Sequence, residues 1–85
     1  MYKIEVSSKK VEKRIKQYIS LRKDIINKLE KLKGDPHKSN GAHKLHGKLS
    51  GKWACWLGSN IRLIYVIDEN KKVLSLDAVG THKIY

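Results

Sequence analysis

An arginine inside an apolar segment and a histidine near the end of the chain are the residues best suited to do chemistry. Arg62 interrupts the apolar segment 61–67, and His82 ends the sequence Gly80-Thr81-His82. A guanidinium group does not lose its proton in a protein and is costly to bury without a partner. Arg62 therefore either has an acidic partner or faces a groove that receives an anion.

Two predicted strands position these residues. Residues 61–67 are rich in β-branched side chains, as is typical of a strand, and residues 73–79 form the next strand after a polar turn. Alternation places Arg62 on one face with Ile64 and Val66. The other face carries hydrophobic side chains, those of Ile61, Leu63, Tyr65 and Ile67. Because His82 follows the second strand, we expect its imidazole near the same sheet.

The charge of the chain indicates the class of partner. The 85 residues contain 19 Lys+Arg and 8 Asp+Glu, which gives a formal net charge of +11. So large an excess attracts polyanions, with nucleic acid as the leading candidate and an acidic protein as the second. A basic surface that serves solubility alone is the third interpretation.

Length and composition predict one small domain, residues 1–85, without a membrane segment. No apolar run approaches the roughly 18 residues needed to span a membrane, and the N-terminus lacks the apolar region of a signal peptide. The single cysteine, Cys55, excludes an internal disulfide and fits a reducing compartment. We therefore expect a cytoplasmic protein.

The N-terminal half predicts a strand followed by a helical hairpin. Residues 2–6 form the strand, and apolar residues then recur with the spacing of two amphipathic helices. The first apolar set is Val11, Ile15 and Tyr18, and the second is Leu21, Ile25, Leu29 and Leu32.

A few residues mark the expected ends of these helices. Ser7 and Ser8 precede the first helix, and either can cap it. Ser20 can start the second helix. Gly34 is suited to the end of that helix, and Pro36 prevents the helix from continuing.

The C-terminal half predicts three further strands. Residues 37–51 are polar, hold three of the six glycines and predict a loop with a brief extended piece around Leu45. Residues 52–57 form a strand in which one face carries Trp53, Cys55 and Leu57. Trp56 has the opposite parity, so we expect one tryptophan in the core and the other exposed. The predicted fold is α+β with the order β-α-α-β-β-β: a twisted, mainly antiparallel sheet with both helices on one face.

Two histidines and three lysines lie in or beside the predicted loop. His43 and His46 are three residues apart, a spacing seen in metal sites, but no cysteine lies near them and we expect neither a metal nor a cofactor. Lys44, Lys48 and Lys52 flank these histidines, either as a solvated face or as phosphate-binding groups.

The motifs from residue 43 onward resemble those of the RelE/ParE superfamily of bacterial and archaeal toxins. The matching motifs are Leu45-x-Gly47, Gly51, Arg62-Leu63-Ile64-Tyr65 and Gly80-Thr81-His82. The Gly-Thr-His ending is most similar to the YafQ-like branch. The resemblance implies a RelE-like fold and a toxin of a type II toxin–antitoxin pair. Such toxins cut messenger RNA, usually in the ribosomal A site, and the C-terminal segment of an antitoxin holds them inactive.

The resemblance also implies roles for individual residues. The YafQ-like branch has histidines at the positions of His43 and His82. RelE has an arginine at the position of Arg62, and the family has an aromatic residue where this chain has Tyr85.

Two positions depart from the YafQ-like branch. Trp56 stands where that branch has a histidine, and Asn60 lies near the position of an aspartate. The absence of that histidine and that aspartate either weakens the enzyme or moves the acid–base work to His43, His46 and His82.

RNA supplies its own nucleophile, the 2′-hydroxyl group, so its cleavage needs no metal. The reaction needs a base, an acid and positive charge beside the phosphate. The acid–base candidates are His82 and His43, with His46 in reserve, and the planar fork of Arg62 suits two phosphate oxygens. The substrate-binding candidates are Trp56, Tyr85, Lys44, Lys48, Lys52 and Asn60.

The expected partners are messenger RNA, the ribosome and a cognate acidic antitoxin, with which the chain would form a hetero-oligomer. The main alternative is a non-enzymatic inhibitor of DNA gyrase of the ParE type. The three histidines argue against it, because such inhibition needs no acid–base pair. The second alternative is a degenerate RNA-binding domain without activity, which Trp56 and Asn60 favour.

Overall fold

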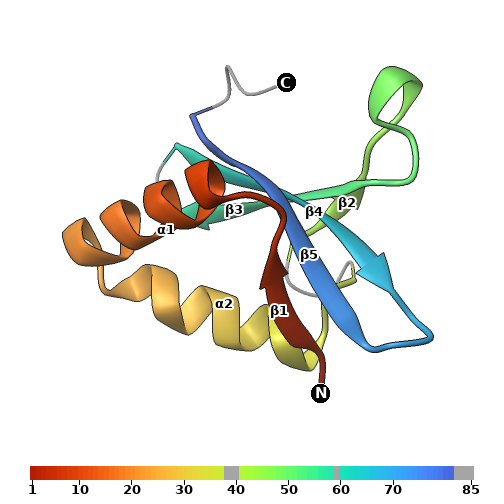
Figure 1. Ribbon diagram of the computed structural model, residues 1–85, viewed down its shortest axis with the longest axis horizontal. Helices are drawn as coiled ribbons and strands as arrows, with labels where there is room; N and C mark the ends of the chain where they lie inside the picture. Colours follow the sequence, from red (N-terminus) through yellow and green to blue (C-terminus); the bar gives the residue numbers. More distant parts are fainter. Residues whose placement is uncertain (38–40, 59, 82–85) are drawn as a thin grey trace.

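The computed structural model describes residues 1–37, 41–58 and 60–81, and Figure 1 shows their arrangement. Two helices follow the first strand, and four strands complete the chain. The elements are β1 (Lys3–Val6), α1 (Lys9–Leu21), α2 (Asp24–Gly34), β2 (His43–Lys44), a 3-10 helix (Gly47–Leu49), β3 (Trp53–Gly58), β4 (Ile61–Asp68) and β5 (Val73–Gly80). None of the helices in the described residues is long and apolar enough to cross a bilayer.

The strands form one mixed sheet in the order β1-β5-β4-β3-β2. β1 runs parallel to β5, and the other neighbouring pairs are antiparallel. Figure 1 shows α1 and α2 together against one face of this sheet. The α+β prediction and its mainly antiparallel sheet are thus confirmed, and the structure adds the short strand β2 within the predicted loop.

The ends of the helices follow from local chemistry. The Oγ atom of Ser8 accepts a hydrogen bond from the backbone N–H of Val11 at 3.2 Å, which confirms one of the two predicted caps. The predicted helix start at Ser20 is wrong, because α1 continues through Ser20 to Leu21. Arg22 is extended, and α2 begins only at Asp24. The Asp24 carboxylate lies at the positive end of α2, where a negative charge is favourable.

The end of α2 is set by the residue before the proline. Gly34 is the last helical residue, and Asp35 is extended with φ −153°. A residue that precedes proline is pushed toward this extended region because the proline ring clashes with a helical neighbour. Pro36, as predicted, stops the helix.

The core lies between the helices and one face of the sheet. Ile25 and Leu32 of α2 are almost fully buried against alternate residues of β3, β4 and β5. The sheet residues in this core are Cys55, Leu57, Ile61, Leu63, Tyr65, Leu74, Leu76 and Val79. The predicted alternation is confirmed, and burial raises the pKa of the Cys55 thiol to about 11.

The opposite face of the sheet is not covered by a helix in the described part of the chain. Arg62 lies on this face, which we call the open face, because alternation directs it away from the helices. Ala54 and Ile64 share the open face and are nevertheless buried. Two apolar side chains thus lie buried beneath the open face, next to Arg62 in the register of the sheet.

Candidate functional site

Arg62 is stacked on Trp56 across neighbouring strands. The two residues are direct partners in the register of β3 and β4, and the Arg62 Cζ atom lies 4.1 Å from the centre of the Trp56 ring. The Nε atom of Arg62 is buried, whereas Trp56 is 41% exposed. An aromatic face attracts a guanidinium and holds it flat. The prediction that one tryptophan is exposed while the other joins the core is confirmed, because Trp53 packs against the core.

On the other side of Arg62 lies a glycine. Arg62 pairs with Gly80 of β5, which is buried and has no side chain. His82 follows Gly80 by two positions in the sequence. His82 and Tyr85 both lie outside the described residues, so their predicted roles remain predictions.

His43 lies on the open face, two register positions from Arg62. His43 pairs with Ala54, and Ala54 pairs with Ile64. Two positions further along the same two strands, Trp56 pairs with Arg62 on the same face. Residues directly opposite each other in antiparallel strands project from the same face of the sheet. His43 is exposed, so its imidazole is accessible to a ligand on this face.

The structure separates His46 and Lys48 from Arg62. His46 immediately precedes the 3-10 helix and Lys48 lies within it, at the tip of the β2–β3 hairpin. Figure 1 shows this tip extending away from the rest of the sheet. His46 and Lys48 are both exposed. In the described part of the chain, no group of three or more His, Cys, Asp or Glu side chains is arranged to hold a metal ion.

The other two lysines of this segment contact protein groups. The Lys44 Nζ atom lies 5.6 Å from the centre of the Trp53 ring, and its register with Trp53 places it on the face opposite His43. Lys52 forms an ion pair with Asp77, with 2.6 Å between Nζ and Oδ2. Asn60, the remaining predicted contact, is exposed in the turn before β4.

Asp77 owes its position to an irregularity in the sheet. Ile64 pairs with Ala78 and Tyr65 pairs with Leu76, so Asp77 is an extra residue in β5. Such a β-bulge redirects the side chain that it carries. The sequence alone did not indicate this bulge, and Asp77 was missed for that reason.

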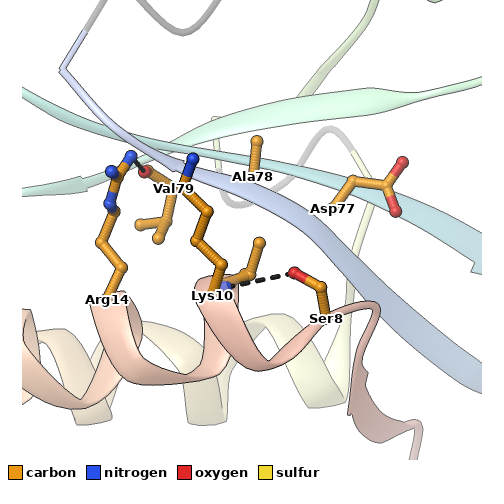
Figure 2. A pocket seen from close by; sticks show the side chains of 7 residues that line it. Ser8, Lys10, Arg14, Asp77, Ala78 and Val79 are labelled. Carbon is orange, nitrogen blue, oxygen red and sulfur yellow. Dashed lines mark hydrogen bonds between the residues drawn. The ribbon is translucent and has the colours of Figure 1, made fainter.

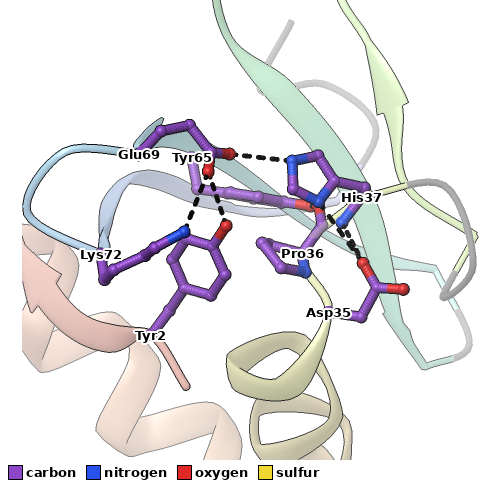
Figure 3. A network of polar contacts seen from close by, with 7 residues as sticks. All are labelled: Tyr2, Asp35, Pro36, His37, Tyr65, Glu69 and Lys72. Carbon is purple, nitrogen blue, oxygen red and sulfur yellow. Dashed lines mark hydrogen bonds and ion pairs between the residues drawn. The ribbon is translucent and has the colours of Figure 1, made fainter.

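A second polar cluster lies at the far end of β4, and Figure 3 shows it. The Glu69 carboxylate accepts a hydrogen bond from the Tyr2 hydroxyl at 2.8 Å and lies 2.9 Å from His37 Nε2. Lys72 is also near, with its Nζ atom 3.6 Å from Glu69 Oε2. The Tyr2 hydrogen bond, followed by His37 and Lys72, holds the pKa of Glu69 below its usual value. This cluster joins the N-terminus, the segment after α2 and the β4–β5 turn.

One buried hydrogen bond fixes the same region from inside. The Tyr65 hydroxyl donates to the backbone carbonyl of Pro36 at 2.7 Å, as Figure 3 shows. Both residues are buried. Burial raises the pKa of Tyr65, so the hydroxyl keeps its proton and remains a donor.

Comparison with known proteins gives a family and a set of solved structures. The model of a family described as "Bacterial toxin of type II toxin-antitoxin system, YafQ" matches residues 2–84. No curated protein matches the sequence. The structure of YafQ from E. coli strain BL21(DE3) is 22% identical, with a TM-score of 0.65 over 99% of this chain and 97% of that chain.

Two further solved structures share the fold. The isolated E. coli RelE toxin is 20% identical, with a TM-score of 0.73 over 95% of this chain and 84% of that chain. The YoeB-YefM complex from Staphylococcus aureus includes a chain that is 18% identical, with a TM-score of 0.71 over 96% of this chain and 98% of that chain. These similarities establish a RelE-like fold.

Proposed function

The chain belongs to the YafQ family of bacterial toxins of type II toxin–antitoxin systems, and we propose that it is a metal-independent endoribonuclease that cleaves messenger RNA. The observation that carries this proposal is Arg62, held over the Trp56 ring on the open face. A guanidinium that is fixed in this way is prepared to bind a phosphate. The net charge of +11 supports a polyanionic substrate.

The proposed reaction uses the RNA as its own nucleophile. A base removes the proton of the 2′-hydroxyl, and the resulting oxygen attacks the adjacent phosphorus. The bond to the 5′-oxygen breaks, and an acid gives that oxygen a proton. The products are a 2′,3′-cyclic phosphate and a free 5′-hydroxyl, so atoms and charges balance without a co-reactant.

We infer that His82 and His43 exchange the two protons. Imidazole titrates near neutral pH and serves as either acid or base. The strand register supports His43, which lies on the open face beside the Trp56–Arg62 pair. The sequence supports His82, because it follows Gly80, the partner of Arg62 on β5.

Arg62 is proposed to stabilise the charge that develops on the phosphate. Its fork donates to two oxygens at once, and stacking on Trp56 fixes its plane before the substrate arrives. A preorganised donor of this kind is typically worth about 2.7–4 kcal/mol in the transition state. His46 and Lys48, at the hairpin tip, are proposed to contact RNA away from the reacting phosphate.

We further propose a cognate antitoxin as the protein partner. Among the structures that share the fold, the S. aureus YoeB chain was crystallised with YefM, and RelBE2 of Mycobacterium tuberculosis is also a toxin–antitoxin complex. A strongly basic chain suits an acidic partner segment. A carboxylate placed against Arg62 would remove the phosphate-binding group and inhibit cleavage.

The test is cleavage of a defined messenger RNA, with and without ribosomes, read by primer extension. Arg62→Ala should reduce the cleavage rate about 10²–10³-fold, as loss of a preorganised donor does. Lys71→Ala is the matched control, because it also removes one positive charge but lies in the exposed β4–β5 turn. Equal rates for the two variants would refute the role of Arg62. Gyrase-dependent DNA breaks without RNA cleavage would support the ParE-type alternative instead.

A further inference from the structure

A basic pocket lies between α1 and β5, on the opposite side of β5 from the open face. Figure 2 shows this pocket, which has a volume of about 350 Å³. Apolar, polar and charged residues line it together. The lining residues are Ser8, Lys10, Val11, Arg14, Asp77, Ala78 and Val79.

Two positive charges converge at one end of the pocket. Lys10 and Arg14 lie one helical turn apart on α1, and Figure 2 shows both side chains extending toward the end of β5. The Nη1 atom of Arg14 donates a hydrogen bond to the backbone carbonyl of Val79 at 3.4 Å. This bond helps to hold the guanidinium there. Like charges at this spacing repel each other, so the pair is unfavourable unless an anion joins it.

The nearby acidic side chain does not neutralise these charges. The carboxylate of Asp77 is engaged by Lys52, and Figure 2 shows it directed away from Lys10 and Arg14. In the described residues neither Lys10 nor Arg14 forms an ion pair with a carboxylate. The pocket therefore presents two charged donors to an external anion.

We propose that this pocket binds a phosphate of the RNA substrate, next to the phosphate that is cleaved. The proposal rests on the proposed function. Val79 pairs with Leu63, and the following residue, Gly80, pairs with Arg62. The pocket and Arg62 thus lie on the two sides of the same end of β5.

A phosphodiester strand fits this arrangement better than an acidic peptide does. An RNA strand carries a negative charge at every nucleotide, so one strand supplies anions to Arg62 and to the pocket together. A phosphate also accepts hydrogen bonds from a guanidinium and an ammonium group at the same time. The Ser8 hydroxyl, which accepts from Val11, keeps its own hydrogen for a further donation.

The experiment measures binding to a single-stranded oligonucleotide whose 2′-hydroxyls are all methylated, so that it is not cleaved. The pocket variant is Lys10→Gln with Arg14→Gln. The control is Lys9→Gln with Lys13→Gln, which removes the same charge at the same spacing from the outer face of α1. The pocket variant should bind about tenfold more weakly at about 0.1 M salt, and the slope of log affinity against log salt should fall by about 0.7 for each phosphate lost. The control should change affinity by much less.

The other outcomes overturn the inference. Equal losses in both double variants would mean diffuse attraction to a basic surface. A loss of affinity for polyglutamate, with RNA affinity unchanged, would assign the pocket to an acidic peptide. In the wild-type protein, an Arg14 Nε–H resonance that does not shift on titration with the oligonucleotide would also refute the proposal, whether or not the variants fold. Failure of the proposed function is seen separately, as absence of wild-type messenger cleavage.

Discussion

Replacing Trp56 tests whether the aromatic ring controls Arg62. The Arg62 Cζ atom lies 4.1 Å from the ring centre, well inside the range of a cation–π interaction. Such interactions are worth about 0.5–1 kcal/mol when exposed and about 2 kcal/mol when desolvated. Trp56 is 41% exposed and the Arg62 Nε is buried, so about 1 kcal/mol is appropriate here.

Two substitutions separate the ring from its volume. Trp56→Phe keeps an aromatic face, whereas Trp56→Leu removes it and leaves a comparable apolar side chain. We expect Trp56→Leu to cleave messenger RNA about fivefold more slowly than Trp56→Phe, since about 1.4 kcal/mol corresponds to a factor of ten. Because Trp56 lies outside the main core, the two variants should melt within about 4 °C of each other.

The assay is the single-turnover cleavage rate of a fluorescent RNA at saturating protein, with a thermal melt of each variant. Equal rates for Trp56→Phe and Trp56→Leu would refute the positioning role. A rate difference that follows the melting temperatures would instead mean that Trp56 supports the fold.

Three further predictions test other parts of the structure. His82→Gln should slow messenger cleavage about 10²–10⁴-fold without lowering the melting temperature; a wild-type rate would remove His82 from the mechanism. Tyr65→Phe leaves the buried Pro36 carbonyl without its donor and should lower the free energy of unfolding by about 1–3 kcal/mol. Each kcal/mol lost should lower the melting temperature by about 4–8 °C. The Glu69 pKa is lower in the folded protein, so its contribution to stability is present above the unfolded pKa and is lost as pH falls through the folded pKa. The melting temperatures of wild type and Glu69→Gln should therefore differ at pH 7 and converge in acid; a constant difference would contradict this linkage.

The faces of the strands could be predicted from the sequence because alternation is a local property. Alternation placed Arg62 on the face opposite Ile61, Leu63, Tyr65 and Ile67, and the structure puts three of these four in the core. The opposite parity of Trp53 and Trp56 predicted that one tryptophan is in the core and the other exposed, and the structure shows that Trp56 is the exposed one. These inferences need only the two-residue period of a strand.

Long-range pairings could not be predicted in the same way. The parallel pairing of β1 with β5 joins residues at opposite ends of the chain, and no local pattern encodes it. The stacking of Arg62 on Trp56 depends on the register of two strands, and the ion pair of Lys52 with Asp77 depends on a bulge. The start of α2 was misplaced because Ser20 is suited to a helix cap but is also tolerated inside α1.

The position of β5 in the sheet has a consequence for the order of events during synthesis. β5 lies between β1 and β4, although it follows β2, β3 and β4 in the chain. Within the described residues, β1 therefore waits for its neighbour in the sheet until residues 73–80 have emerged from the ribosome. At roughly 5–20 residues per second, the ribosome needs about 3–13 s to make the segment between β1 and β5. The β1–β5 pair, and the pairing of Gly80 with Arg62, can form only after that interval.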